Sequence, residues 1–488
     1  MSAPRRRFLR WMGLSPLFAS ACKIEPILDL PPPPEPELIN FPDLPPRIPD
    51  ELEDAEEVLE ATVDAFLDRE SPYLAGELRQ RSPENPRTTE HLIALMQVFG
   101  LEPAGMRGGW LQPVELRLVE APAEATPLVR VRQEESETNA ETTNVVELIE
   151  HGAFRQRRAG RVDALLLANI RQLGEPLPRE LVAGRVVLLR APKDFDMSTL
   201  LDQIDGLGAL ARQSGAAGCI LLLAKGGDEQ LVLLRERWAR QFQLAESSEA
   251  DELVIEGVLS ATGSQLLSDA VVNDQTWVLD ADLGLRERSI TSHNVAGRLA
   301  GRDLPGEAPV LVCAWDTPPG GDGRLETLRL LASLATIAEL SEWQRRGTKP
   351  RRSILALFAI DAGLGAGQLA HARWTTTSGV QPTAIIAFDR IDPDTLHSAV
   401  LLSGHFDARV TELATRGARR DGRDLLLGNE LSLPSLAPYL RAPIPVMTIG
   451  AAPDAGVTGE DPPRSGLHAE IRLVRNLLLA LAERVSAP

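Results

Sequence analysis

Cysteine is scarce in this sequence, which has 3 cysteines among 488 residues. A scaffold built on several disulfides is therefore excluded, although one disulfide between Cys219 and Cys313 stays open. Both residues lie in apolar runs, which is typical of buried structural cysteines. An excess of positive charge is also absent. The formal net charge of −18 argues against a nucleic-acid partner, because phosphate binding requires a basic surface.

The N-terminus lacks an apolar run long enough to span a bilayer. Residues 11–21 are weakly apolar and too short for a membrane helix. They follow Arg5-Arg6-Arg7-Phe8-Leu9-Arg10, which resembles the twin-arginine export motif of proteins that fold before crossing a membrane. These features predict a signal peptide at residues 1–21. A basic tail without a signal function is the alternative.

Cys22 follows Ala19-Ser20-Ala21, and this context has two interpretations. Cleavage can occur after an Ala-x-Ala site, or Cys22 can be lipidated as in a bacterial lipoprotein. Eight prolines between residues 31 and 46 predict a stiff, extended spacer in residues 22–50. A lipid on Cys22 followed by such a spacer would hold a folded domain off a membrane. We therefore expect an exported lipoprotein in the periplasm or on the outer face of a membrane.

The remainder has the patterns of α/β domains. Residues 51–100 are helical in pattern, and residues 120–150 are polar and expected to be loop or sheet edge. Residues 184–190, 200–214 and 215–223 form a predicted strand, helix and strand. Further strands are predicted at residues 309–315, 353–360, 384–388, 399–403 and 445–449, with helices at 325–340 and 467–485. Alternating strands and helices predict a doubly wound, mostly parallel sheet.

The order of these segments resembles the zinc aminopeptidases of metallopeptidase family twenty-eight (clan MH) that carry an inserted protease-associated domain. Four segments carry the resemblance: Phe99–Gly105, Trp110–Val114, Val182–Leu188 followed by Ala211–Ile220, and Asn294–Leu299. The resemblance implies an aminopeptidase-like domain at residues 51–150 and 291–488, and a smaller α/β protease-associated insert at residues 151–290.

Enzymes of this kind hold two zinc ions about 3.5–4 Å apart, which lower the pKa of a bound water. They need histidine and carboxylate ligands and a carboxylate base. In this sequence the place of the first ligand histidine falls on Ala314, and the supporting aspartate is Asp316. The bridging aspartate falls on Asp322. The catalytic base falls on Asp361, and the ligand glutamate beside it is replaced by Ala362.

The other two ligand places fall near the C-terminus. The resemblance assigns Asp389 as a metal ligand and places the last ligand histidine near residues 457–460, where Glu460 is the substitute. Because the loss of one supporting partner already lowers metal affinity about 10–100-fold, we expect no bound metal. The predicted function is a non-catalytic binding or scaffold protein of the envelope that takes a peptide or another envelope protein. An active exopeptidase with two zinc ions and rearranged ligands is the alternative.

Other interpretations of the same residues remain open. His405-Phe406-Asp407 has the His-x-Asp spacing, but a surface or capping role of His405 is favoured. An aspartate at a strand end also commonly closes a turn or caps a helix, which applies to Asp322, Asp361 and Asp389. Residues 354–368 imitate a dinucleotide fingerprint, but Gln368 stands where its last glycine belongs. No Gly-x-Ser-x-Gly motif of a serine hydrolase occurs.

Overall fold

A computed structural model provides the coordinates. It describes residues 53–75, 81–122, 124–133, 145–156, 161–172, 177–195, 200, 204, 207, 211, 214–245, 255–271, 276–317, 323–347, 349–361, 365–375, 380–393, 395–429, 431, 433–452 and 464–483. The predicted signal, Cys22, the spacer, Asp322, Ala362 and Glu460 lie outside these residues.

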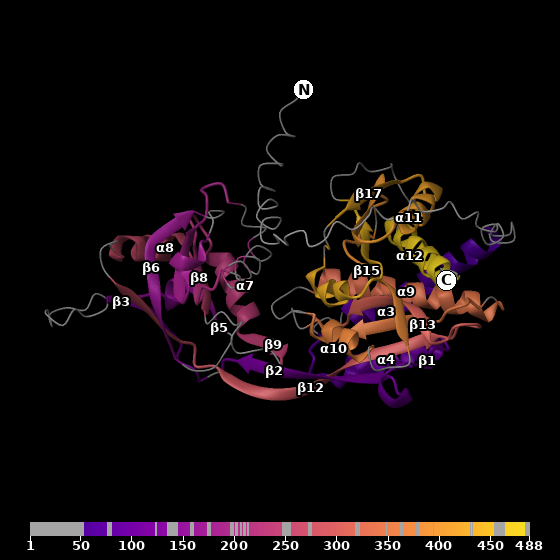
Figure 1. The fold of residues 1–488 in the computed structure, drawn as a ribbon, viewed down its shortest axis with the longest axis horizontal. Coiled ribbons are helices and arrows are strands. Elements are labelled where there is room, and N and C mark those ends of the chain that lie inside the picture. Colours follow the sequence, from indigo (N-terminus) through magenta and orange to yellow (C-terminus); the bar gives the residue numbers. More distant parts are fainter. Residues whose placement is uncertain are drawn as a thin grey trace, which may run out of the picture.

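The described residues form two lobes, each built around one sheet (Figure 1). The larger lobe has a ten-stranded sheet. Its order is β17 (Asp424–Gly428), β16 (Ala399–His405), β18 (Val446–Ala451), β15 (Gln381–Phe388), β13 (Glu307–Ala314), β14 (Ile354–Ala359), β12 (Arg286–Leu299), β2 (Leu111–Glu120) and β9 (Arg240–Leu244), and β1 (Glu102–Pro103) pairs with β12.

The smaller lobe has an eight-stranded sheet. Its order is β4 (Val145–Glu147), β3 (Leu128–Gln133), β11 (Trp277–Asp282), β6 (Val162–Gln172), β7 (Arg185–Arg190), β8 (Gly218–Leu222), β10 (Ile255–Leu259) and β5 (Gly152–Gln156). The parallel pair β7–β8 confirms the predicted strands at residues 184–190 and 215–223. Among the described residues, the helices beside this sheet are α5 (Arg179–Val182), α7 (Asp228–Trp238) and α8 (Ala261–Ala270). Most of the predicted helix at residues 200–214 lies outside the described residues.

The centre of the larger sheet is parallel and covered on both faces, as the sequence predicted. β14, β13, β15 and β18 are parallel neighbours. Alternate residues of β13 belong to different cores: Leu311 and Cys313 pack in one, and Val310 and Val312 pack in the other. A strand buried on both faces needs an unbroken apolar run, and β13 supplies one. The outer strands β12 and β2 are antiparallel to their neighbours.

Helices cover both faces of the larger sheet. The first core contains side chains of α3 (Glu53–Ala75), α4 (Pro86–Val98), α9 (Arg324–Arg345), α11 (Ala408–Arg420) and α12 (Ser465–Glu483). The second contains side chains of the 3-10 helix η6 (Pro434–Arg441), with α10 (Ala366–Trp374) beside it. The predicted helices at residues 325–340 and 467–485 correspond to α9 and α12.

The smaller lobe is inserted between two long strands of the larger sheet. β2 and β12 pair from Val295↔Leu111 to Arg286↔Glu120, and they join the lobes in Figure 1. The strand membership differs from the predicted boundaries of the insert at both ends. β3 and β4 already belong to the smaller sheet, because alternating valines within the polar stretch 120–150 pair with β11. Residues 286–290 belong to β12 of the larger sheet.

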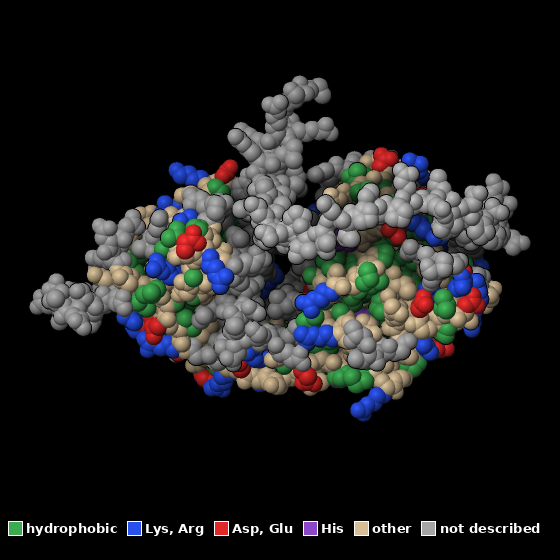
Figure 2. Space-filling view, in the orientation of Figure 1, with side chains coloured by type: hydrophobic (Ala, Val, Ile, Leu, Met, Phe, Trp, Pro, Cys, Tyr) green, Lys and Arg blue, Asp and Glu red, His purple; other side chains and the backbone are tan. Residues whose placement is uncertain are grey.

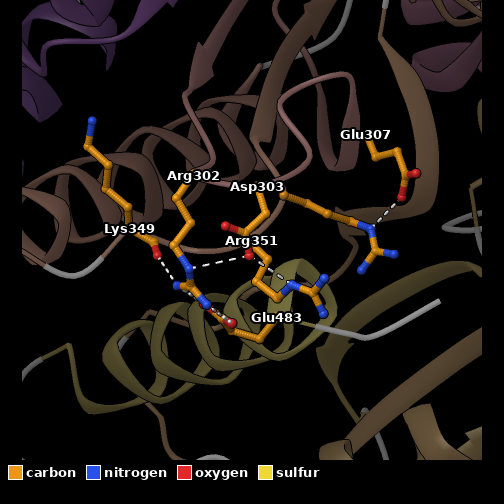
Figure 3. A network of polar contacts seen from close by, with 7 residues as sticks. Arg302, Asp303, Glu307, Lys349, Arg351 and Glu483 are labelled. Carbon is orange, nitrogen blue, oxygen red and sulfur yellow. Dashed lines mark hydrogen bonds and ion pairs between the residues drawn. The ribbon is translucent and has the colours of Figure 1, made fainter.

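A polar network closes the edge of the larger sheet where β13 and β14 begin (Figure 3). Arg302 forms ion pairs with Asp303 and with Glu483 of α12, at 3.5 and 3.2 Å. Arg351 pairs with Asp303 at 3.0 Å. These partly exposed pairs join the β12–β13 turn to the end of α12. They lie at the opposite end of the strands from the residues predicted to form the site.

Cys219 in β8 and Cys313 in β13 are both buried and are not joined by a disulfide, so the disulfide that the sequence left open is absent. Burial raises the pKa of the Cys313 thiol to about 11. In the described part of the chain, none of the helices combines the length and hydrophobicity of a membrane span.

His371 of α10 is fully buried, and its Nδ1 lies 2.9 Å from the hydroxyl oxygen of Tyr439 in η6. Burial lowers the pKa of this imidazole from 6.5 to about 3, because the charged form would lose its hydration. The folded protein therefore keeps His371 neutral in mildly acidic solution, where the same residue in the unfolded chain takes up a proton.

This burial predicts a loss of stability in acid. Between pH 6.5 and about 3 the unfolded chain binds one more proton at residue 371, so the free energy of unfolding falls as the pH falls. At pH 5 the expected loss from this group is about 2 kcal/mol. Urea unfolding at pH 7 and pH 5 measures it. His371→Gln should lose less stability over this interval than the wild type, and equal losses would contradict the prediction.

Candidate functional site

Three of the predicted site residues lie along one edge of the larger sheet, just after the ends of three parallel strands. Parallel β13, β14 and β15 end at Ala314, Ala359 and Phe388. Asp316, Asp361 and Asp389 follow these ends within two residues. The carboxyl ends of parallel strands are the usual location of ligand sites in open α/β sheets. The structure therefore brings Asp316, Asp361 and Asp389 to the expected edge.

Ala314 ends β13 at the place where the resemblance expects the first ligand histidine. Its methyl group can bind no metal. Asp316 next to it is 3% exposed, and its Oδ1 accepts a hydrogen bond of 2.7 Å from the backbone N–H of Asp361. Asp316 therefore holds the end of β14 against the end of β13, and this role requires no metal.

Asp361 closes the loop that leads to α10. Its Oδ1 accepts a hydrogen bond of 2.8 Å from the backbone N–H of Gly365, which has a φ of +68° and precedes the first residue of the helix. Burial raises the pKa of the Asp361 carboxyl, while this hydrogen bond and the charge of Arg329 oppose the shift. The turn-closing interpretation of Asp361 is confirmed; a catalytic role stays a prediction.

Asp389 pairs with an arginine of α9. The Arg329 guanidinium donates from Nε to the Asp389 carbonyl oxygen at 2.7 Å and from Nη2 to Oδ1 at 3.0 Å. Both side chains are mostly buried, with 19% and 14% exposure. The carboxylate that the resemblance assigns to a metal thus has a guanidinium as its positive partner.

A second arginine lies at the same strand end. Arg81 is 1% exposed, and it donates from Nε to the carbonyl oxygen of Trp315 at 2.6 Å and from Nη1 to the hydroxyl of Thr327 in α9 at 3.0 Å. Burial lowers the pKa of this guanidinium, and the neighbouring acidic groups of Cys313, Asp316 and Glu326 oppose the shift. Arg81 therefore places a second buried positive charge near Asp316.

A buried asparagine positions the loop that carries Asp361. Asn294 of β12 is fully buried, and its Nδ2 donates to Gln112 Oε1 at 3.0 Å and to the Gly367 carbonyl at 2.9 Å. Its Oδ1 accepts from the Ile360 N–H at 3.0 Å. A Cβ at residue 367 would lie 2.1 Å from Asn294 Oδ1. Only glycine fits at residue 367, because any other side chain would collide with Asn294. Asn294 thus hydrogen-bonds the backbone at Ile360 and at Gly367, on either side of Asp361.

The sequence matches no family model, and no curated protein matches it. Solved structures do resemble the chain. An aminopeptidase from Aneurinibacillus sp. has a TM-score of 0.53 and 14% identity, over 88% of this chain and 92% of that chain. A family twenty-eight peptidase precursor from Shewanella amazonensis has a TM-score of 0.50 and 11% identity, over 88% and 97%. A zinc aminopeptidase from Bacillus subtilis has a TM-score of 0.47 and 11% identity, over 87% and 94%.

The chain has an aminopeptidase-like fold. At these identities the likeness establishes the fold and leaves the activity of this chain to be argued from its own residues. Within the aminopeptidase-like fold, the described residues include Asp389 but neither Asp322 nor Glu460 of the predicted ligands. No three of their His, Cys, Asp and Glu side chains lie close enough together to hold a metal ion. Ala314 supplies no ligand, and Asp389 already has a positive partner in Arg329.

Histidines elsewhere in the aminopeptidase-like fold serve other interactions. Asp407 caps α11 by accepting from the Val410 N–H at 2.9 Å, a role that the sequence did not assign to this aspartate. His405 is exposed at the end of β16, beside a depression of about 450 Å³. Because β16 is antiparallel to β18 and pairs His405 with Val446, this depression lies at the sheet edge opposite Asp389. His468 is mostly buried and pairs with Asp64 of α3 at 3.1 Å.

Sequence reasoning missed Arg329, Arg81 and the role of Asn294. Arg329 lies within a helix of otherwise largely apolar residues, and an arginine on a buried helix face normally has a carboxylate partner. That signal could have marked Arg329, but it could not have named Asp389, 60 residues away. Arg81 lies in a polar stretch of sequence before α4, and no local pattern indicates that its side chain is buried.

Proposed function

We propose that this protein is a non-catalytic member of the zinc aminopeptidase family, and that it binds a peptide or a partner protein in the cell envelope. The observation that carries this proposal is the pair formed by Arg329 and Asp389. A carboxylate that ligates zinc uses its oxygen atoms on the metal. Here one of those oxygens and the backbone carbonyl of Asp389 both accept from Arg329.

Electrostatics disfavours a zinc ion beside this pair. A guanidinium 3.0 Å from Oδ1 carries a full positive charge at every physiological pH. A divalent cation at the same carboxylate would lie within a few ångströms of that charge, where repulsion in a partly buried site is strong. Arg81 near Asp316 adds a second such charge. Both arginines therefore favour a centre without a metal.

The proposal has three further parts: the identity of the smaller lobe, export with anchoring at Cys22, and a surface for the peptide. We propose that the smaller lobe, which lies between β2 and β12 in the chain, is the protease-associated insert that the resemblance implies. The signal-like N-terminus and the proline-rich spacer favour export and anchoring through Cys22. Figure 2 shows a hollow between the lobes with hydrophobic side chains of the larger lobe beside it, which is a suitable surface for a peptide.

An active zinc exopeptidase remains the second candidate, because Asp322 and Glu460 supply two further carboxylates at family positions. This candidate requires Arg329 to release Asp389 when zinc binds. It therefore predicts that zinc stabilises the protein, whereas the non-catalytic proposal predicts no effect of zinc.

Zinc content, turnover and thermal stability distinguish the two candidates. We expect the purified protein to contain no stoichiometric zinc, to hydrolyse no aminoacyl p-nitroanilide with or without added zinc, and to melt at the same temperature in zinc and in chelator. A bound zinc at 100 times its Kd would instead add about 2.7 kcal/mol of stability.

The decisive variant is Asp322→Ala, with Asp228→Ala on the exposed start of α7 as its matched control. Stoichiometric zinc and turnover that Asp322→Ala abolishes and Asp228→Ala preserves would overturn the non-catalytic proposal.

A further inference from the structure

The last strand of the larger sheet has an open edge. Within the described residues, β17 pairs with β16 alone, in parallel register from Ala399↔Asp424 to Ser403↔Gly428. Figure 1 shows β17 at the outer end of the larger lobe, with α11 beside it. The backbone N–H and C=O groups along the outer side of a terminal strand are available to another strand.

β17 exposes hydrophobic side chains at this edge. Its sequence is Asp-Leu-Leu-Leu-Gly, and Leu426 and Leu427 are 46% and 53% exposed. Because successive strand residues point to opposite faces, each face of the sheet presents one of these leucines beside the open edge. Natural edge strands are usually protected by lysine, proline or a bulge, and β17 contains no lysine or proline.

The helix next to β17 carries positive charge. Arg416, Arg419 and Arg420 are exposed on the last turns of α11, immediately before the turn into β17. Arg416 pairs with Glu412 within the helix. No described carboxylate pairs with Arg419 or Arg420, although the whole chain has a net charge of −18. Asp424 at the start of β17 is also exposed, so Arg419 and Arg420 outnumber this carboxylate and favour an acidic partner.

We propose that β17 binds an extended segment of an acidic partner protein by strand addition. The partner's backbone would continue the hydrogen-bond ladder of the larger sheet beyond β17. Its apolar side chains would pack beside Leu426 and Leu427, since neighbouring side chains across strands stabilise a sheet. Its acidic side chains would lie near Arg419 and Arg420. This surface is separate from the centre around Asp389, so the inference does not depend on the proposed function.

The test uses the full chain and a fluorescent synthetic peptide of alternating valine and glutamate. Binding is followed by fluorescence anisotropy. Two matched peptides identify the mode: one has methylated backbone nitrogens on the edge that would pair with β17, and the other has lysine in place of glutamate. We expect the acidic peptide to bind, and both matched peptides to bind at least about tenfold more weakly, equivalent to about 1.4 kcal/mol.

Two double variants test the surface. Leu426→Lys with Leu427→Lys, and Arg419→Glu with Arg420→Glu, are each expected to weaken binding of the acidic peptide by about tenfold or more. Val232→Lys with Leu233→Lys on α7 is the control for the first, because these residues are 51% and 45% exposed. Arg87→Glu with Arg107→Glu, both exposed, is the control for the second. Neither control should change the affinity.

Several results would overturn the inference. Equal binding of the backbone-methylated peptide would show charge attraction without strand addition. Unchanged binding by either double variant would place the peptide elsewhere, and no binding to the full chain would contradict a free acceptor edge. Residues 24–44 contain Ile, Leu, Glu and Asp. If the peptide bound only after deletion of these residues, they would themselves be the segment that covers the edge of β17. Loss of self-association in the leucine variant would instead identify a second copy.

Discussion

Replacing Asn294 with alanine is expected to lower the free energy of unfolding by about 3–4 kcal/mol. The side chain is fully buried and serves Gln112, Gly367 and Ile360. Alanine would leave the Ile360 N–H and the Gly367 carbonyl without this partner in the interior, and each unsatisfied buried group costs about 1–3 kcal/mol. The loop that carries Asp361 would lose its anchor to β12. Urea unfolding at pH 7 measures the loss.

Asn476→Ala is the matched control for this variant. Asn476 lies partly buried on α12 and accepts from its neighbour Arg475. Its loss removes a single side-chain hydrogen bond, so it should lower the free energy of unfolding by only about 0.5–1.5 kcal/mol. Asn294→Asp keeps the acceptor for Ile360 but removes both donated hydrogen bonds, so it should also be strongly destabilised. A loss below about 1 kcal/mol in Asn294→Ala would show that the buried groups find other partners.

Replacing Arg329 with leucine is expected to cost about 2–3 kcal/mol, because it leaves the mostly buried Asp389 carboxylate without its positive partner. Asp389→Leu should have a comparable cost, because it leaves the mostly buried Arg329 guanidinium without its negative partner. The double variant should be clearly more stable than the sum of the two losses predicts, since neither charge then remains unpaired. Denaturant unfolding of the four proteins gives the coupling energy directly.

The exposed pair Arg416–Glu412 on α11 is the control for this cycle. Its side chains are 53% and 60% exposed, so its coupling energy should stay within about 0.5 kcal/mol. A coupling energy near zero for Arg329 and Asp389 would contradict the proposed replacement of a metal by arginine. A coupling energy that disappears when zinc is added would favour the active exopeptidase.

The strands and long helices of the larger lobe were predictable because burial on both faces leaves a strong pattern. Residues 354–360 and 384–388 are continuous apolar runs, and a strand covered by helices on both sides requires such runs. The helix at residues 325–340 likewise extends only a few residues further in α9. The prediction of strands was least successful in the polar stretch 120–150. There β3 alternates valine with arginine and is buried on one side only.

The candidate site was predictable only in part. The alignment of strand ends placed Asp316, Asp361 and Asp389 at one edge, because parallel strands end together. Which atoms those carboxylates bind could not be predicted. Asp316 accepts from a backbone N–H 45 residues away, and Asp361 accepts from Gly365.

By itself the sequence determined the α/β class, the doubly covered sheet and the absence of a histidine at position 314. Each of these depends on residue identity or on a periodicity within one element. Only the tertiary structure decided that Arg329 is the partner of Asp389 and that β17 has an open edge within the described residues. These features depend on how α9 packs over the end of β15 and on where the sheet stops. Such contacts join distant parts of the chain, and no local spacing encodes them.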